Sequence, residues 1–273
     1  MATKTATSST KKTTTIAKVS STNKPVALAK KVSESFKSTP VIGAFIAEFI
    51  GTFLFVLAFF QMQSSPLFVT FAVVGIFLML GGVAGVHLNP AVTIGAWVTR
   101  KINSVKAIGY IVAQALGGTA AWLVLTAFLN GSGAGTTGTS LFHAATITPG
   151  KEWYVLFAEL IGVAVIAFGF AVALKQKHEK TAAAFTAGLA VLVGLYIAMS
   201  LTTVLLTESY TALSFLNPVF AFVANGLSWN IWPIAIYILV PVLGGIIGFG
   251  LQNILSSQTT DVRDCGCDCN CKK

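Results

Sequence analysis

Two Asn-Pro pairs, Asn89-Pro90 and Asn217-Pro218, interrupt apolar stretches of this sequence, one in each half of the chain. Asn is a preferred N-cap residue, and Pro fits the first position of a helix, where its missing N–H would have no partner in any case. Each pair therefore predicts the abrupt start of a short helix, with Ala91 or Val219 as its second residue. One Asn-Pro pair is ordinary turn chemistry, whereas two at matching places in a very apolar chain indicate a shared role.

Such a pair of helices could let a neutral molecule pass through the membrane. Two short helices that meet N-terminus to N-terminus would bring two positive dipole ends to one point. The side-chain amides of Asn89 and Asn217 would offer N–H donors there, and the backbone carbonyls leading into each break would offer acceptors. Such a lining replaces the hydrogen bonds that a solute loses on leaving water, while the positive midpoint opposes cations and protons.

Two carboxyl groups, Glu48 and Glu159, lie in the middle of apolar segments, where a bare charge costs a few kcal/mol or more. A functional role such as a proton relay is one interpretation. Their equivalent places in the two halves favour a structural role, in which each carboxylate accepts backbone N–H groups from a broken loop. His87 and Gln114 likewise predict loop-supporting or packing groups rather than ligands.

Four cysteines alternate with other residues near the end of the chain: Cys265, Cys267, Cys269 and Cys271. Thiolates prefer soft metals such as Zn, Cu(I) or trivalent arsenic, so these residues are candidate metal ligands. The spacing is not a defined zinc-finger pattern. A reduced, disordered tail and lipidated cysteines are the alternatives.

The composition indicates an integral membrane protein. Hydrophobic residues make up 55% of the chain, charged residues only 10%, and the mean hydropathy is +0.79, whereas soluble domains carry about 25% charged residues. The net charge of +9 does not indicate nucleic-acid binding, because nearly half of the 18 basic residues lie within residues 1–40 and the others flank apolar segments. We expect membrane lipid and a small solute as partners, and no cofactor.

Six apolar segments are long enough to span a bilayer, for which about 20 helical residues suffice. They are Val41–Gln61, Leu67–Val83, Ile102–Leu129, Trp153–Leu174, Ala182–Leu206 and Ile231–Leu255. The two pieces after the Asn-Pro pairs, Pro90–Val98 and Pro218–Leu227, are too short to cross. They predict half-helices that dip into the membrane, which is allowed only where the broken backbone lines a polar cavity.

The ends of the chain are predicted to be cytoplasmic tails. Residues 1–40 are rich in Ser, Thr and Lys and predict a disordered segment, and residues 257–273 form the Cys-rich tail after a channel domain at 41–256. With six spans both termini lie on one side of the membrane. The basic residues of the tails and of two inter-helix loops fall on that side, and only Lys151 falls on the other, so the positive-inside rule makes it the cytoplasm.

The two halves repeat, at about 41–129 and 152–256. Ala47–Gly51 matches Ala158–Gly162, the Leu-Asn-Pro breaks match, and Leu116-Gly117-Gly118 matches Leu243-Gly244-Gly245. Three spans in each half make the two copies antiparallel, an inverted repeat whose broken helices meet near the midplane. We interpret the paired glycines as sites of close helix packing.

The run from Gly85 to Thr93, Gly-x-His-x-Asn-Pro-Ala-Val-Thr, resembles the first signature of the aquaporin and glycerol-facilitator (major intrinsic protein) family. The resemblance covers roughly Val41 to Leu255. It implies an all-α bundle of six transmembrane helices with two re-entrant half-helices. It also implies passive flux of water or small neutral solutes, and a homotetramer in which each subunit has its own pore.

The second signature departs from the family pattern. Members usually have Asn-Pro-Ala-Arg there, whereas this chain has Asn217-Pro218-Val219-Phe220. The other filter positions implied by the family fall near Val69, Leu195 (or Leu201) and Ser214, so the predicted filter is almost wholly apolar. Water and glycerol stay candidates, and ammonia, hydrogen peroxide, dissolved gases and neutral metalloid hydroxides join them, because an apolar neck can stop conduction by dewetting.

Two other functions remain open at this point. One is a secondary transporter in which Glu48 or Glu159 couples protons, since repeats and broken helices also suit transporters. The other is a non-conducting membrane protein whose cysteine tail binds metal. An enzyme is not expected, because the sequence has no recognisable nucleophile–base set or phosphate-binding loop.

Overall fold

The structure is a computed structural model that describes residues 39–62, 65–131, 146–176, 178–203, 205, 214–224, 227 and 230–263. All the regular structure in these residues is helical. The first repeat contains α2 (Thr39–Met62), α3 (Pro66–Ala84), α4 (Pro90–Val98) and α5 (Ser104–Gly131). The second contains α7 (Glu152–Ala173), α8 (Lys180–Thr203), α9 (Pro218–Val223) and one continuous helix made of α10 (Ile231–Ile234), the π-helical turn η2 (Ala235–Leu239) and α11 (Val240–Arg263).

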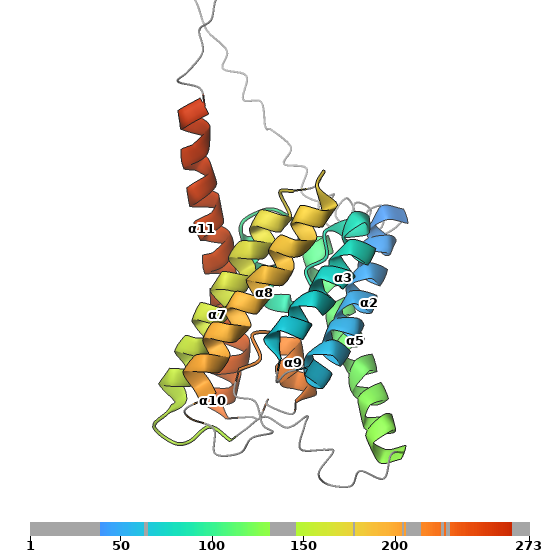
Figure 1. Cartoon of the computed structure of the whole chain (residues 1–273), viewed down its shortest axis with the longest axis vertical. Coiled ribbons are helices and arrows are strands. Elements are labelled where there is room, and N and C mark those ends of the chain that lie inside the picture. The colour runs from blue at the N-terminus through green and yellow to red at the C-terminus, as the bar shows by residue number, and fades with distance from the viewer. Residues whose placement is uncertain are drawn as a thin grey trace, which may run out of the picture.

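The predicted all-α membrane bundle is confirmed. Within the described part of the chain, five helices are long and apolar enough to cross a membrane: Val41–Met62, Ser104–Gly131, Glu152–Ala173, Lys180–Thr203 and Ile231–Ser257. The apolar helix α3 is shorter and completes the six, and the short helices α4 and α9 begin at the two Asn-Pro pairs. The last helix continues to Arg263, past the predicted end of its span, and projects beyond the other helices at the end of the bundle where α2 begins (Figure 1).

The helix packing repeats in the two halves, as the inverted repeat predicts. In the first half α2 packs on α3 and α5, and in the second half α7 packs on α8 and α11. Across the halves, α4 contacts α11 while α9 contacts α5, and the symmetric pairs α3–α8 and α4–α9 also touch. Each half-helix is therefore packed against the last helix of the other repeat.

The paired glycines make these crossings tight. A Cβ atom on Gly245 of α11 would lie 2.1 Å from the backbone oxygen of Ala91 in α4, and one on Gly95 of α4 would lie 2.4 Å from the backbone oxygen of Gly245. At the equivalent crossing in the other half, a Cβ atom on Gly118 of α5 would lie 2.2 Å from Cγ1 of Val219 in α9. The first crossing is backbone against backbone, and the second is backbone against a side chain.

Because Val219 is the obstacle at the second crossing, we expect Gly118→Ala to destabilise the protein and Val219→Ala to compensate for it. Overpacking a core by one methyl group costs about 1–3 kcal/mol. Thermal unfolding in detergent should show a lower transition temperature for Gly118→Ala, and recovery in the Gly118→Ala/Val219→Ala double variant. Gly131→Ala on the same helix is the control, since a Cβ atom there meets no atom within 4 Å. Additive effects of the two substitutions would contradict this contact.

The last span differs from its counterpart by one π-helical turn. The N–H of Val240 donates to the carbonyl of Ala235, five residues earlier, and the turn ends at Leu239, two residues before Pro241. Proline has no N–H to donate, and its ring clashes with the carbonyl four residues earlier in a regular α-helix. The wider turn gives the chain room for Pro241, which occupies the position that Gln114 has in the first repeat.

Candidate solute pathway

The two half-helices begin in the same way. Asn89 and Asn217 both have extended backbone conformations, and Pro90 and Pro218 are the first helical residues. The Oδ1 atom of Asn89 accepts a hydrogen bond from the N–H of Ala91 at 2.8 Å, and Oδ1 of Asn217 accepts one from Val219 at 3.0 Å. These bonds satisfy one of the free N–H groups that every helix start leaves, which is why the helices begin at these residues.

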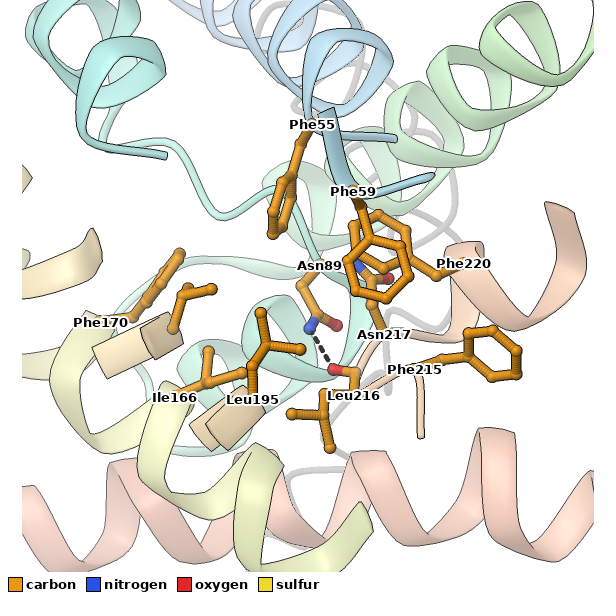
Figure 2. Close-up of a pocket in the computed structure, with 11 residues that line it drawn as sticks. Phe55, Phe59, Asn89, Ile166, Phe170, Leu195, Phe215, Leu216, Asn217 and Phe220 are labelled. Carbon is orange, nitrogen blue, oxygen red and sulfur yellow. Dashed lines mark hydrogen bonds between the residues drawn. The ribbon is translucent and has the colours of Figure 1, made fainter. Parts of the chain in front are cut away.

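The amide nitrogens of the two asparagines hold the half-helix starts together. Nδ2 of Asn89 donates to the backbone oxygen of Leu216 at 2.8 Å, and Nδ2 of Asn217 donates to the backbone oxygen of Leu88 at 2.9 Å. Figure 2 shows the first of these bonds beside the aromatic residues described below. An amide NH₂ group has two hydrogens, so each asparagine uses one of them in this reciprocal pair. The sequence predicted both amides as donors to a solute and did not predict the bonds between the loops.

The residue before each asparagine has a left-handed backbone. Leu88 has φ 59° and Leu216 has φ 56°, a conformation that is uncommon for a bulky residue. Both side chains are buried against glycines: a Cβ atom on Gly51 would lie 2.5 Å from Leu88, and one on Gly162 would lie 2.6 Å from Leu216. Close packing therefore holds the two loops in this conformation.

The buried carboxylates bind the same loops. Glu48 accepts hydrogen bonds from the backbone N–H groups of His87 and Leu88, at 2.5 and 2.9 Å, and from Nε2 of Gln114 at 2.8 Å. Glu159 accepts from the backbone N–H groups of Phe215 and Leu216, at 2.5 and 3.0 Å. These contacts agree with the structural interpretation of both residues.

The repeated Ala-Glu-x-x-Gly motif now has a physical explanation. The Glu and the Gly are three residues apart, on one face of the first helix of each repeat. The carboxylate accepts N–H groups from the loop, and the glycine leaves space for the leucine of the same loop. The matching positions of the two motifs could have indicated this from the sequence, whereas the left-handed leucines gave no local signal.

A cluster of three polar side chains, Thr93, Gln114 and His87, supports the first break. Thr93 Oγ1 donates to the backbone oxygen of Asn89 at 3.1 Å, accepts from Nε2 of Gln114 at 2.9 Å, and lies 3.2 Å from Nδ1 of His87. In the tautomer that carries its hydrogen on Nδ1, His87 donates to the same hydroxyl oxygen. The imidazole edge also packs on Tyr110, with the ring centres 5.1 Å apart.

The second break has apolar residues at these positions. Phe215, Ala221 and Pro241 stand where the first repeat has His87, Thr93 and Gln114. The ring pair is kept, since Phe215 packs edge-on against Tyr237 with centres 5.2 Å apart. The two halves of the molecule therefore share a backbone arrangement, but the second has apolar side chains at these three positions.

Phe220, at the position of the family's arginine, lies in an aromatic cluster with three residues of α2: Phe55, Phe59 and Phe60. Its ring centre is 4.3 Å from that of Phe59, with the rings inclined at 32°, and 4.8 Å from that of Phe55 in an edge-on contact. Phe60 is 6.2 Å away. Phe220 is buried, and its ring overlaps that of Phe59 in Figure 2.

A cavity lies between this aromatic cluster and the two asparagines (Figure 2). The centre of a water molecule can occupy about 10 Å³ of this cavity, and the wall around it is apolar. The lining comes from both repeats: Phe55, Phe59, Asn89, Ile166, Phe170, Val191, Leu195, Phe215, Leu216, Asn217 and Phe220. The space is enough for one molecule of about the size of water.

Two of the four predicted filter residues, Leu195 and Phe220, line this cavity. Val69 is buried and is not part of the lining, and Ser214 is buried with its hydroxyl 3.3 Å from that of Thr202. Of the two alternatives on α8, Leu195 faces the cavity and Leu201 is 48% exposed. The sequence missed Phe55, Phe59 and Phe170 as lining residues, because an aromatic residue in an apolar span gives no sign of the direction in which it points.

The candidate metal ligands Cys265, Cys267, Cys269 and Cys271 lie outside the described residues. Within the part of the chain that the structure describes, there is no group of three His, Cys, Asp or Glu residues arranged to hold a metal ion.

Basic residues of the two repeats lie near each other after α4 and α7. Burial lowers the pKa of Lys175, and the charge of Lys101 lowers it further.

The fold and this site define an integral membrane protein in which two asparagine-capped half-helices meet inside a bundle of six spans. The family model of the major intrinsic proteins matches residues 35–251, and the chain belongs to this family.

Known proteins that resemble the chain are aquaporins and glycerol facilitators. It is 27% identical over 198 residues to aquaporin AqpM of Methanothermobacter marburgensis, with 69% of this chain and 74% of that protein covered. It is 27% identical to the glycerol uptake facilitator protein-like 6 of Lactiplantibacillus plantarum, with 80% and 96% covered. The aquaglyceroporin of Plasmodium falciparum has the same fold, with a TM-score of 0.63 at 17% identity over 81% of this chain and 99% of that one.

Proposed function

We propose that this protein is a passive membrane channel for small neutral solutes, whose pathway runs past Asn89 and Asn217 and between the side chains of the aromatic cluster. The observation that carries the proposal is the joined pair of half-helix starts with a cavity beside them. The relatives are named as aquaporins and as a glycerol facilitator, which supports water and glycerol-like solutes as the general class.

The two half-helix starts would do the selecting. Each asparagine keeps one amide hydrogen that is not used between the loops, and a solute oxygen or nitrogen could accept it. The positive ends of α4 and α9 disfavour a cation at the same point. No energy source enters this mechanism, so the solute would move down its own gradient.

Proton coupling receives less support than passive flux. Glu48 and Glu159 both accept backbone N–H groups of the re-entrant loops, and a carboxylate that holds a loop in place is poorly suited to changing its charge in every transport cycle. We therefore propose that both carboxylates, together with His87 and Gln114, support the loops. The metal-binding role of the cysteine tail stays a separate prediction.

The orientation and assembly are part of the same proposal. We place both termini in the cytoplasm, because basic residues gather in the loops predicted on the same side of the membrane. They include Arg100, Lys101, Lys106 and Lys175. A homotetramer is expected from the family, with a separate pathway in each subunit. Chemical cross-linking in membranes would test the number of subunits.

Stopped-flow light scattering on proteoliposomes tests the channel function. Vesicles with the protein should shrink faster than empty vesicles under a gradient of at least one neutral solute, and an imposed pH gradient should leave this rate unchanged. Rates equal to those of empty vesicles for every solute would contradict a channel. Rates that depend on the pH gradient would favour the transporter.

Replacing Phe220 tests the course of the pathway. We expect Phe220→Ala to raise water permeability several-fold in the same assay, because it removes the ring that closes the cavity on the side of α2. The control is Phe222→Ala, since Phe222 lies on the same short helix and is 52% exposed. Truncating a buried Phe costs about 3–5 kcal/mol, so Phe220→Leu serves as a milder variant and gel filtration checks the fold of each. Equal water permeability in all four proteins would mean that the pathway does not pass Phe220.

A further inference from the structure

We propose that the cavity between Asn89, Asn217 and the aromatic cluster is a dry chamber that takes one small, weakly hydrated neutral molecule, of the class of dissolved gases, in preference to water. The inference rests on the proposed channel function for the permeation step, and on the cavity alone for the binding step. It names the solute class that the channel would favour.

The polar groups near the chamber are largely occupied by one another. The Oδ1 atoms of both asparagines accept from their own half-helices, and their Nδ2 atoms donate across to Leu88 and Leu216. The carbonyl oxygens of Leu88 and Leu216 each accept one of these bonds and keep a second lone pair. The accessible wall of the cavity is apolar, so the surface that a guest touches is aliphatic or aromatic.

A lining of this kind suits water poorly. A buried water makes about three hydrogen bonds, within a range of two to four, and donates some of them. In this chamber a water molecule would meet the carbon surface of the wall and could make few of these bonds. A buried donor without a partner costs about 1–3 kcal/mol. Apolar cavities of this kind stay dry and take up apolar guests instead.

A dissolved gas suits the same lining. Carbon dioxide donates no hydrogen bond, its two oxygens can each accept one weak bond, and it loses little hydration on leaving water. Diatomic gases and xenon need no polar partner at all. The volume of about 10 Å³ for the centre of a water-sized molecule limits the chamber to one such guest. Glycerol, with three hydroxyl groups, is too large and too polar for it.

The aromatic rings on the side of α2 strengthen the preference for a gas over water. A solute that reaches the chamber from the side of α2 must pass the rings of Phe55, Phe59 and Phe220, which pack against one another at centre distances of 4.3 and 4.8 Å. An apolar constriction stops a hydrated solute by dewetting, because no group on it replaces the lost water. A gas molecule has no hydration shell of comparable strength to lose.

The binding step can be tested with xenon, which requires no transport. We expect saturable xenon binding to the full-length protein in detergent, measured by ¹²⁹Xe NMR. Leu195→Asn should abolish it, since Leu195 lines the chamber and an amide of similar size would let water in. Leu201→Asn, on the exposed side of the same helix, should bind xenon as the unchanged protein does. Xenon binding that is absent, or that survives in Leu195→Asn, would overturn the chamber.

The permeation step is tested in vesicles of sphingomyelin and cholesterol loaded with carbonic anhydrase and a pH dye. We expect the protein to accelerate carbon dioxide entry over empty vesicles by a larger factor than it accelerates osmotic water flux, and Leu195→Asn to reverse that order. Water acceleration that equals or exceeds that of carbon dioxide would overturn the inference and leave the channel standing. Xenon binding with no flux of any solute would overturn the channel and support the chamber as a binding site.

Discussion

Gly245→Ala is expected to prevent assembly of the native bundle. The new methyl group would lie 2.1 Å from the backbone oxygen of Ala91, and the same crossing places the backbone oxygen of Gly245 2.4 Å from a Cβ atom built on Gly95. A backbone atom cannot turn away as a side chain can, so α4 and α11 would have to separate. The cost is expected to exceed the roughly 1–3 kcal/mol of ordinary overpacking. The start of α4, which Asn89 caps, would be displaced as well.

The measurement is the yield of monodisperse protein in detergent, followed by thermal unfolding of whatever is recovered. The matched control is Gly250→Ala, because Gly250 lies on the same helix and a Cβ atom there meets no atom within 4 Å. A Gly245→Ala protein with the yield and unfolding temperature of the control would show that α4 and α11 do not cross as closely as described.

Glu48→Leu is expected to have an effect of similar size for an electrostatic reason. It would leave the backbone N–H groups of His87 and Leu88 without their acceptor, and Nε2 of Gln114 would keep only Thr93. An unsatisfied backbone group in a membrane interior costs several kcal/mol, because no water can replace the lost partner. The loop before Asn89 should lose its conformation, and little folded protein should be recovered.

Two further variants make this result specific. Glu48→Gln keeps one acceptor oxygen but adds an NH₂ group that faces donors, so its stability should fall between that of Glu48→Leu and the unchanged protein. Glu179→Leu removes an exposed carboxylate outside the spans and should change the unfolding temperature little. Recovery of Glu48→Leu at the yield of Glu179→Leu would rule out the loop-supporting role.

The two asparagine-capped half-helices follow from the sequence alone because their signals are local. An Asn-Pro pair specifies a cap and a first turn within three residues, and both helices begin where these pairs predict. The six apolar segments and the repeated motifs were sufficient for the class of fold, since a bilayer imposes length and hydropathy directly on the chain. The predicted ends were less accurate where no cap marks them: α9 ends at Val223, whereas we predicted Leu227.

The chemistry at the centre depends on contacts between residues far apart in the chain. The two hydrogen bonds that the asparagine amides make between the loops join residues 127 and 129 positions apart. Each carboxylate accepts from a loop beyond its own helix. No local propensity indicates which carbonyl such an amide will find.

Hydropathy and local motifs are enough to indicate the spans, the two breaks and the lack of an arginine at position 220. The folded molecule is needed to see that Phe220 packs against Phe55 and Phe59, and that Leu195 rather than Val69 or Ser214 faces the cavity. An apolar side chain on a spanning helix is equally compatible with lipid and with the protein interior, so its type does not show which way it points. Packing against the other repeat then determines which side chains face lipid and which line the pathway.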